Sequence, residues 1–133
     1  MSARKALLVV VGLAALTFAV AAPAQAGAED YHFEAVSTAV HNGTGSEIAI
    51  RIVHTPTGRT IDNAIIFRTR LDMSPDDMDD MEARIIPASS QEPGTYRFNA
   101  DLTMAGRWAL KLMAKVPGEK DTITGTVILE AQD

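Results

Sequence analysis

The stretch that decides the fold is TYRFNADLTMAGRWALKLMAKV, which runs from Thr95 to Val116. Its apolar side chains occupy every second position in two runs, Tyr96, Phe98, Ala100 and Leu102, and then Trp108, Leu110, Leu112, Ala114 and Val116. Successive side chains of a β-strand point to opposite faces of a sheet, so this period of two predicts two strands, each with one buried face. The residues around Met104 form the loop between them.

The same alternation extends outward from this stretch in both directions. EIAIRIVH (Glu47–His54), TIDNAIIFRTR (Thr60–Arg70) and DTITGTVILEA (Asp121–Ala131) each indicate a strand, and turn-rich segments such as HNGTGS and PGEK separate them. No helical period of useful length occurs after residue 26. These patterns predict an all-β fold: an immunoglobulin-like antiparallel β-sandwich of about seven strands, with one short helix in a loop.

The N-terminus has the pattern of a secretory signal peptide rather than of a folded segment. Arg4 and Lys5 precede an apolar run, and Ala24-Gln25-Ala26 matches an A-x-A cleavage site. Residues 1–26 are therefore expected to be a signal peptide, and residues 27–133 a single domain in the periplasm with no membrane span after cleavage. The alternative is a retained membrane anchor, for which the apolar run is short.

Composition narrows the function classes. The chain of 133 residues contains no Cys, which excludes thiol catalysis and cysteine metal sites. It has no recognisable nucleophile motif and no zinc-ligand spacing among its three His residues, so no enzyme is expected. A formal net charge of −5 disfavours nucleic acid as a partner and allows a cation or a cationic protein.

A second stretch, LDMSPDDMDDMEARI (Leu71–Ile85), carries the candidate site. Ser74 followed by Pro75 predicts a helix start, and Asp77 completes a capping box, so a helix over Pro75–Glu82 is expected. On that helix, methionines would either seal the core or offer their thioethers to a ligand. An EF-hand calcium loop is disfavoured because the required spacing and glycine are missing.

The ligand interpretation predicts a soft-metal site. Met73, Met78 and Met81 would share one side of the helix, and Met104 would add a fourth sulfur if its loop lies at the same end of the sandwich. Thioethers favour Cu(I) or Ag(I) over harder ions, which makes either ion the expected bound metal. His32 is a weaker fifth candidate.

Two motifs in these stretches resemble the YtkA-like/FixH family of exported domains. Its G-x-Y strand and the following M-x-G-x-W are matched by Gly94 and Tyr96, and then by Met104, Gly106 and Trp108. Its Met-Pro-Met loop is matched by Met73, Pro75 and Met78. The resemblance covers about residues 48–129 and implies an immunoglobulin-like sandwich of heavy-metal efflux or copper-handling systems. Unlike a FixH protein proper, this chain carries a cleavable type of signal.

Together these observations predict a periplasmic, non-enzymatic accessory protein that binds Cu(I) or Ag(I) through Met73, Met78, Met81 and Met104. Its expected partners are the envelope proteins of a metal-efflux or copper-delivery system. The alternative is an adaptor that binds no metal and docks on such an envelope complex through its acidic segment.

Overall fold

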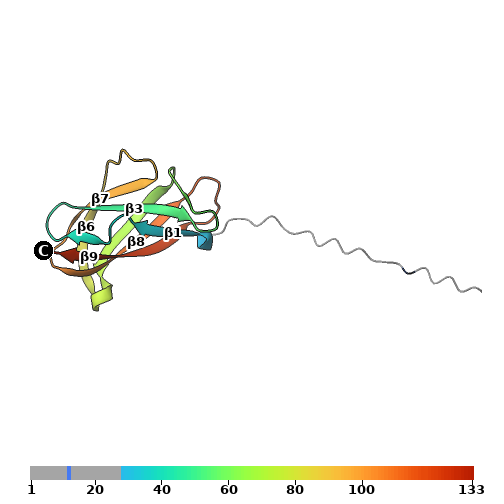
Figure 1. Cartoon of the computed structure of the whole chain (residues 1–133). Coiled ribbons are helices and arrows are strands. Elements are labelled where there is room, and N and C mark those ends of the chain that lie inside the picture. The colour runs from blue at the N-terminus through green and yellow to red at the C-terminus, as the bar shows by residue number, and fades with distance from the viewer. Residues whose placement is uncertain (1–11, 13–27) are drawn as a thin grey trace, which may run out of the picture.

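The computed structural model describes residue 12 and residues 28–133, and residues 28–133 form a β-sandwich (Figure 1). In chain order its elements are the 3-10 turn η1 (Ala28–Asp30), β1 (Tyr31–Ala35), β2 (Ala39–His41), β3 (Ser46–His54), β4 (Arg59–Thr60), β5 (Ile65–Met73), the 3-10 turn η2 (Ser74–Asp76), β6 (Met78–Ala88), β7 (Thr95–Asp101), β8 (Gly106–Lys115) and β9 (Ile123–Gln132). The all-β prediction is confirmed. Within the described part of the chain, no helix is long and apolar enough to cross a membrane. Apart from residue 12, the expected signal peptide over residues 1–26 lies outside the described residues.

The strands form two layers that share β6. One layer has the order β1–β3–β7–β6, with the small β4 beside β3, and the other has the order β6–β5–β8–β9–β2. β6 pairs with β5 through its first half and with β7 through its second half, so it crosses from one layer to the other. The layers match the two sheets of an immunoglobulin-type sandwich, and β1 and β2 are two parts of a divided first strand. All pairings are antiparallel except that of β2 with β9.

The inner faces of the two layers carry the alternating apolar residues that the sequence analysis identified. Trp108, Leu110 and Leu129 are completely buried, and Phe98 and Ala100 are nearly so. Because side chains alternate between the faces of each strand, one apolar stripe per strand is enough to build this core. The prediction that Trp108 is a core residue is confirmed.

Close packing between the layers depends on one small residue of β9. A Cβ atom added to Gly125 would lie 2.8 Å from Cε2 of Phe33, the buried aromatic residue of β1. The absence of a side chain at position 125 therefore lets the ring of Phe33 lie directly against the backbone of β9.

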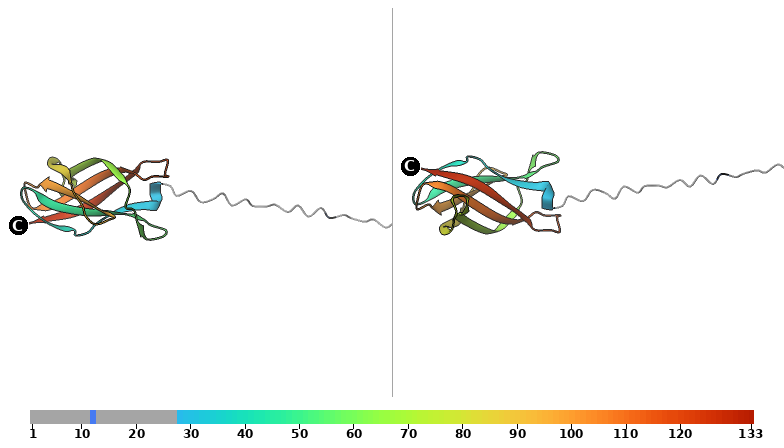
Figure 2. Two further views of the ribbon diagram at one scale, coloured as in Figure 1. Left: turned by 90° about the horizontal axis from the view of Figure 1, so that it is seen from above. Right: turned by 90° about the horizontal axis from the view of Figure 1, so that it is seen from below.

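The two ends of the sandwich are distinct. β1 begins at one end, where Tyr31 pairs with His54, and η2 lies at the other end, where Gly106 pairs with Ala131. The view from above and the view from below show the start of β1 and the C-terminus at opposite ends (Figure 2).

The predicted helix over Pro75–Glu82 is wrong, since helical structure in this segment is limited to the 3-10 turn η2 and the strand β6 begins at Met78. Ser74 does not cap it; instead the backbone N–H of Ser74 donates to Oδ1 of Asp72 at 3.0 Å. Asp77 adopts a left-handed conformation with φ of 58°, which ends the turn and redirects the chain into β6. Aspartate side chains often form turns by accepting the backbone N–H of the second residue after them. Asp72 does so with Ser74, and this hydrogen bond takes the place of the expected capping box.

Candidate functional site

Two segments that are about thirty residues apart meet at the η2 end of the sandwich. Oδ2 of Asp76 accepts the backbone N–H of Arg107 at 2.8 Å, and Oδ1 of Asp76 accepts Nε of Arg107 at 2.9 Å. The same guanidinium donates to the carbonyl oxygen of Pro75 at 2.8 Å. These three bonds join the turn after β5 to the start of β8. We call residues 73–78 and 104–108 together the methionine corner.

Gly106 allows the two segments to approach this closely. Its φ is 138°, and a Cβ atom there would lie 2.7 Å from Cε of Met73 and 2.8 Å from Oδ2 of Asp76. Glycine alone fits this position without strain or collision. The next-but-one residue, Trp108, is buried and donates its indole N–H to the carbonyl oxygen of Met104 at 3.1 Å, which fixes the loop before β8.

Three of the four candidate methionines belong to this corner. Met73 and Met78 are partners in the β5–β6 register; Met73 is buried, and Met78 is half-buried against the same core. Met104 is exposed in the adjoining loop. Partners in an antiparallel pair have neighbouring side chains, so Met73 and Met78 occupy adjacent positions at the edge of the core.

Met81 is placed differently from the other three. The register of β5 with β6 passes from the pair Met73–Met78 directly to the pair Asp72–Glu82, so residues 79–81 bulge out of the ladder. The side chain of Met81 is exposed on this bulge. The premise that a shared helix face gathers Met81 with Met78 is therefore wrong, because this segment is a strand with a bulge.

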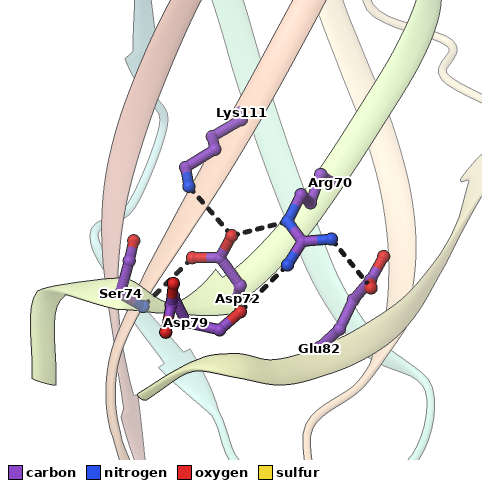
Figure 3. A network of polar contacts seen from close by, with 6 residues as sticks. All are labelled: Arg70, Asp72, Ser74, Asp79, Glu82 and Lys111. Carbon is purple, nitrogen blue, oxygen red and sulfur yellow. Dashed lines mark hydrogen bonds and ion pairs between the residues drawn. The ribbon is translucent and has the colours of Figure 1, made fainter. Parts of the chain in front are cut away.

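A buried carboxylate lies directly beside the corner (Figure 3). The side chain of Asp72 is fully buried, and its Oδ2 accepts Nε of Arg70 at 2.8 Å and Nζ of Lys111 at 2.9 Å. Oδ1 accepts the N–H of Ser74, as described above. Since each carboxylate oxygen has at least one donor, the burial of the charge is compensated.

These donors determine the pKa of Asp72. Burial alone would raise the pKa of this carboxyl, but the hydrogen bonds from Ser74, Lys111 and Arg70 outweigh burial and hold its pKa well below the usual range. The carboxylate is thus ionised at any physiological pH. Hydrogen bonds from the backbone N–H and the side chain of Arg107 likewise lower the pKa of Asp76.

Arg70 also explains why the acidic segment runs as a strand. Its guanidinium donates to Oε2 of Glu82 and to the carbonyl oxygen of Asp79, each at 2.9 Å (Figure 3). These contacts tie the two sides of the bulge to β5. The contact with Arg70 holds the backbone of Asp79 against β5.

Two of the three histidines, His32 and His54, lie at the end of the sandwich opposite the methionine corner. His32, the fifth candidate, lies on β1, where its ring nitrogens contact Thr55 Oγ1 at 2.6 Å and Glu34 Oε1 at 2.8 Å. His54, near the start of β1, stacks at a tilt on Tyr31. Within residues 28–133, no group of three or more His, Cys, Asp or Glu side chains is arranged to hold a metal ion.

Sequence reasoning missed the polar framework of the corner. Arg70 and Asp72 are two residues apart on one strand, which places them on the same face of the sheet. Their ion pair could therefore have been predicted from the sequence. Lys111 and Arg107 could be added only through the register of β5 with β8 and the fold of η2. The sequence carries no local signal for that alignment.

Comparisons with known proteins place the chain in a family. No curated protein matches it. Among solved structures it is similar to the ZirS C-terminal domain, with 8% sequence identity, 79% of this chain and 67% of that chain covered, and a TM-score of 0.46. The family model described as YtkA-like matches residues 25–113, which include both segments of the methionine corner. The chain therefore belongs to the YtkA-like family.

Proposed function

We propose that the chain is a non-enzymatic, exported accessory domain that binds Cu(I) or Ag(I) at the methionine corner and serves a metal-efflux or copper-handling system of the bacterial periplasm. The observation that supports it is the joining of two sequence segments by Asp76, Arg107 and Gly106. This joining brings the methionines of both segments to one end of the sandwich.

The proposed ligands are the thioethers of Met73, Met78 and Met104. Thioether sulfur is a soft ligand, so such a set favours Cu(I) or Ag(I). Met73 would form the floor of the site, half-buried Met78 its wall and exposed Met104 its entrance. Asp76 is occupied by Arg107 and contributes charge rather than a ligand atom.

Met81 gives a matched control, because it is a nearby methionine outside the corner. Cu(I) is titrated into the protein in competition with a coloured Cu(I) chelator under reducing conditions. Met73→Leu/Met78→Leu/Met104→Leu is expected to weaken copper binding by at least about tenfold, whereas Met81→Leu binds as the unaltered protein does. Equal affinities of the triple variant and the unaltered protein would show that the corner does not bind copper.

Trp108 supplies an independent signal for the same site. It is the single tryptophan of the chain, and its indole is hydrogen-bonded to the backbone of Met104. Cu(I) at the corner is therefore expected to change its fluorescence in proportion to occupancy. Copper binding that leaves the emission of Trp108 unchanged would place the metal elsewhere on the molecule.

A second candidate function is that of a protein adaptor that docks through its acidic segment. The observation that favours it is the bulge of β6, on which Asp79 and Asp80 are exposed beside the exposed Asp77. If this segment is the docking surface, Asp77→Lys/Asp79→Lys/Asp80→Lys abolishes pull-down of an envelope efflux partner while copper binding persists. Asp76 is left unchanged because it holds Arg107.

A further inference from the structure

A basic groove lies on the outer face of the layer that contains β5, β8 and β9. Its volume is about 360 Å³. The side chains that matter here are Arg68, Lys111, Met113, Thr124 and Thr126. They come from three neighbouring strands and form two rows across the sheet, because Arg68 is opposite Met113 and Thr124, and Arg70 is opposite Lys111 and Thr126.

Positive charge gathers on this face although the whole chain has a net charge of −5. Arg68, Arg70 and Lys111 lie in the two rows, and Lys115 lies in the next row along β8, opposite Ile65. Two cations directly opposite each other, as Arg70 and Lys111 are, would normally repel. Here both side chains donate to the buried carboxylate of Asp72, whose negative charge offsets the repulsion between the two cations.

The basic side chains of this face differ in how many hydrogen bonds and ion pairs they already make within the protein. Arg70 donates to Asp72, Glu82 and the backbone of Asp79, so its hydrogen-bonding capacity is largely used. Within the described part of the chain, the side chains of Arg68 and Lys115 have neither a hydrogen bond nor an ion pair with another residue, and both are exposed. The exposed hydroxyls of Thr124 and Thr126 line the groove beside them.

We infer that this groove binds an extended acidic segment of a partner protein, whose carboxylates pair with Arg68, Lys111 and Lys115. Side chains on one face of an extended chain repeat about every 7 Å, which is the spacing of successive outward side chains along β5 and β8. Met113 offers a polarisable, adaptable surface between the cations for the aliphatic parts of such a segment. The inference is separate from the metal proposal, because it uses none of the corner methionines.

The remainder of the molecule selects a short segment over a large polyanion. A strongly acidic protein repels nucleic acid and anionic membranes over long distances. A short segment that lies over Arg68 and Lys115 meets the local positive charge at the end of the face away from Glu82, which pairs with Arg70. Charge complementarity of this exposed kind supplies modest affinity that falls with salt.

The test uses the metal-free protein and a fluorescent hexapeptide of alternating Glu and Thr, measured by fluorescence anisotropy. We expect saturable binding at low salt that weakens as salt is added. Arg68→Gln/Lys115→Gln is expected to weaken it by about tenfold, which is about 1.4 kcal/mol for the two exposed charge pairs together. Arg84→Gln/Lys120→Gln, which removes the same charge elsewhere on the surface, should bind as the unaltered protein does.

Three outcomes would overturn the inference. One is equal binding by the groove variant and the unaltered protein when both unfold at the same temperature. Another is equal binding of a peptide with Gln in place of Glu. The third is binding of a single-stranded oligonucleotide at least as tight as that of the acidic peptide, which would assign the groove to a different class of ligand.

Discussion

At the scale of single residues, Asp72 has the most consequential environment in the molecule. It is a completely buried charge that binds two cations and a backbone N–H, and it lies between the methionine corner and the basic groove. A buried ion pair stabilises a fold only when every polar atom is satisfied. Asp72 meets that condition, and its removal would leave Arg70 and Lys111 side by side without their shared acceptor.

Asp72→Asn is expected to lower the free energy of unfolding at neutral pH by about 2 kcal/mol, because it removes charge-assisted hydrogen bonds from a buried group. The pKa of Asp72 is lower in the folded than in the unfolded chain. Its contribution is therefore fully present above an unfolded pKa of about 4 and is lost as the pH falls further. Denaturant unfolding from pH 7 to pH 2 should thus show a flatter acid limb for the variant. Asp80→Asn, an exposed carboxylate, is the control with the same change of charge.

Comparison of alanine variants at Gly106 and Gly43 can separate the cost of backbone strain from the cost of a steric clash of the added methyl group. Their φ angles are nearly equal, 138° and 142°, but a Cβ atom at Gly43 would meet nothing nearer than 3.9 Å. Both alanine variants should carry a conformational cost of about 1 kcal/mol. Gly106→Ala should lose about 1–3 kcal/mol more, because its methyl collides with Met73 and Asp76. Equal losses in thermal unfolding would show that the corner relaxes around a side chain at position 106.

At the scale of elements, β6 is the unusual strand. It belongs to both layers, and its bulge over residues 79–81 lies near its start, between its pairs Met73–Met78 and Asp72–Glu82 with β5. Bulges often mark functional edges and reorient side chains. Here the bulge separates Met81 from Met78 and presents the acidic side chains to solvent, so one irregularity shapes both candidate functions.

The contact of β1 with β9 gives an element-scale prediction. Gly125→Ala is expected to destabilise the fold by about 1–3 kcal/mol, since its methyl would overlap the ring of Phe33. Phe33→Leu removes that overlap, so the double variant should lose less than the sum of the two single variants. A double-mutant cycle in denaturant measures the difference. Strict additivity would mean that the two residues do not contact each other in solution.

At the scale of the whole molecule, the shared strand β6 ties the two layers into one unit. We expect one cooperative unfolding transition, in which the fluorescence of the buried Trp108 and the far-ultraviolet circular dichroism of the strands coincide. A fluorescence change that precedes the loss of strand signal would show that the layer containing β8 opens separately.

The sequence predicted the layers well because each strand needs only a local alternation, as in Thr95–Val116. It failed where a local signal competed with distant partners. Ser74 and Pro75 form a good helix start, yet Arg107 and Arg70 engage Asp76 and the Asp79 carbonyl and hold the chain in a turn and a strand. The shared face for Met78 and Met81 was predicted from that helix, so the exposure of Met81 on the bulge follows from the absence of the helix.

The opposed ends of the sandwich also bear on how the protein should be handled. Ala131 pairs with Gly106, and the side chain of Asn42 donates to the carboxylate of Asp133, so the last residues lie beside the methionine corner. A purification tag or surface linker fused after Asp133 would crowd that end. If the protein is attached to a solid support ahead of Ala28, the methionine corner lies at the far end of the sandwich. Its distance from the attachment point is then roughly the length of β8, about 30 Å. Immobilised binding assays should therefore use the N-terminal side.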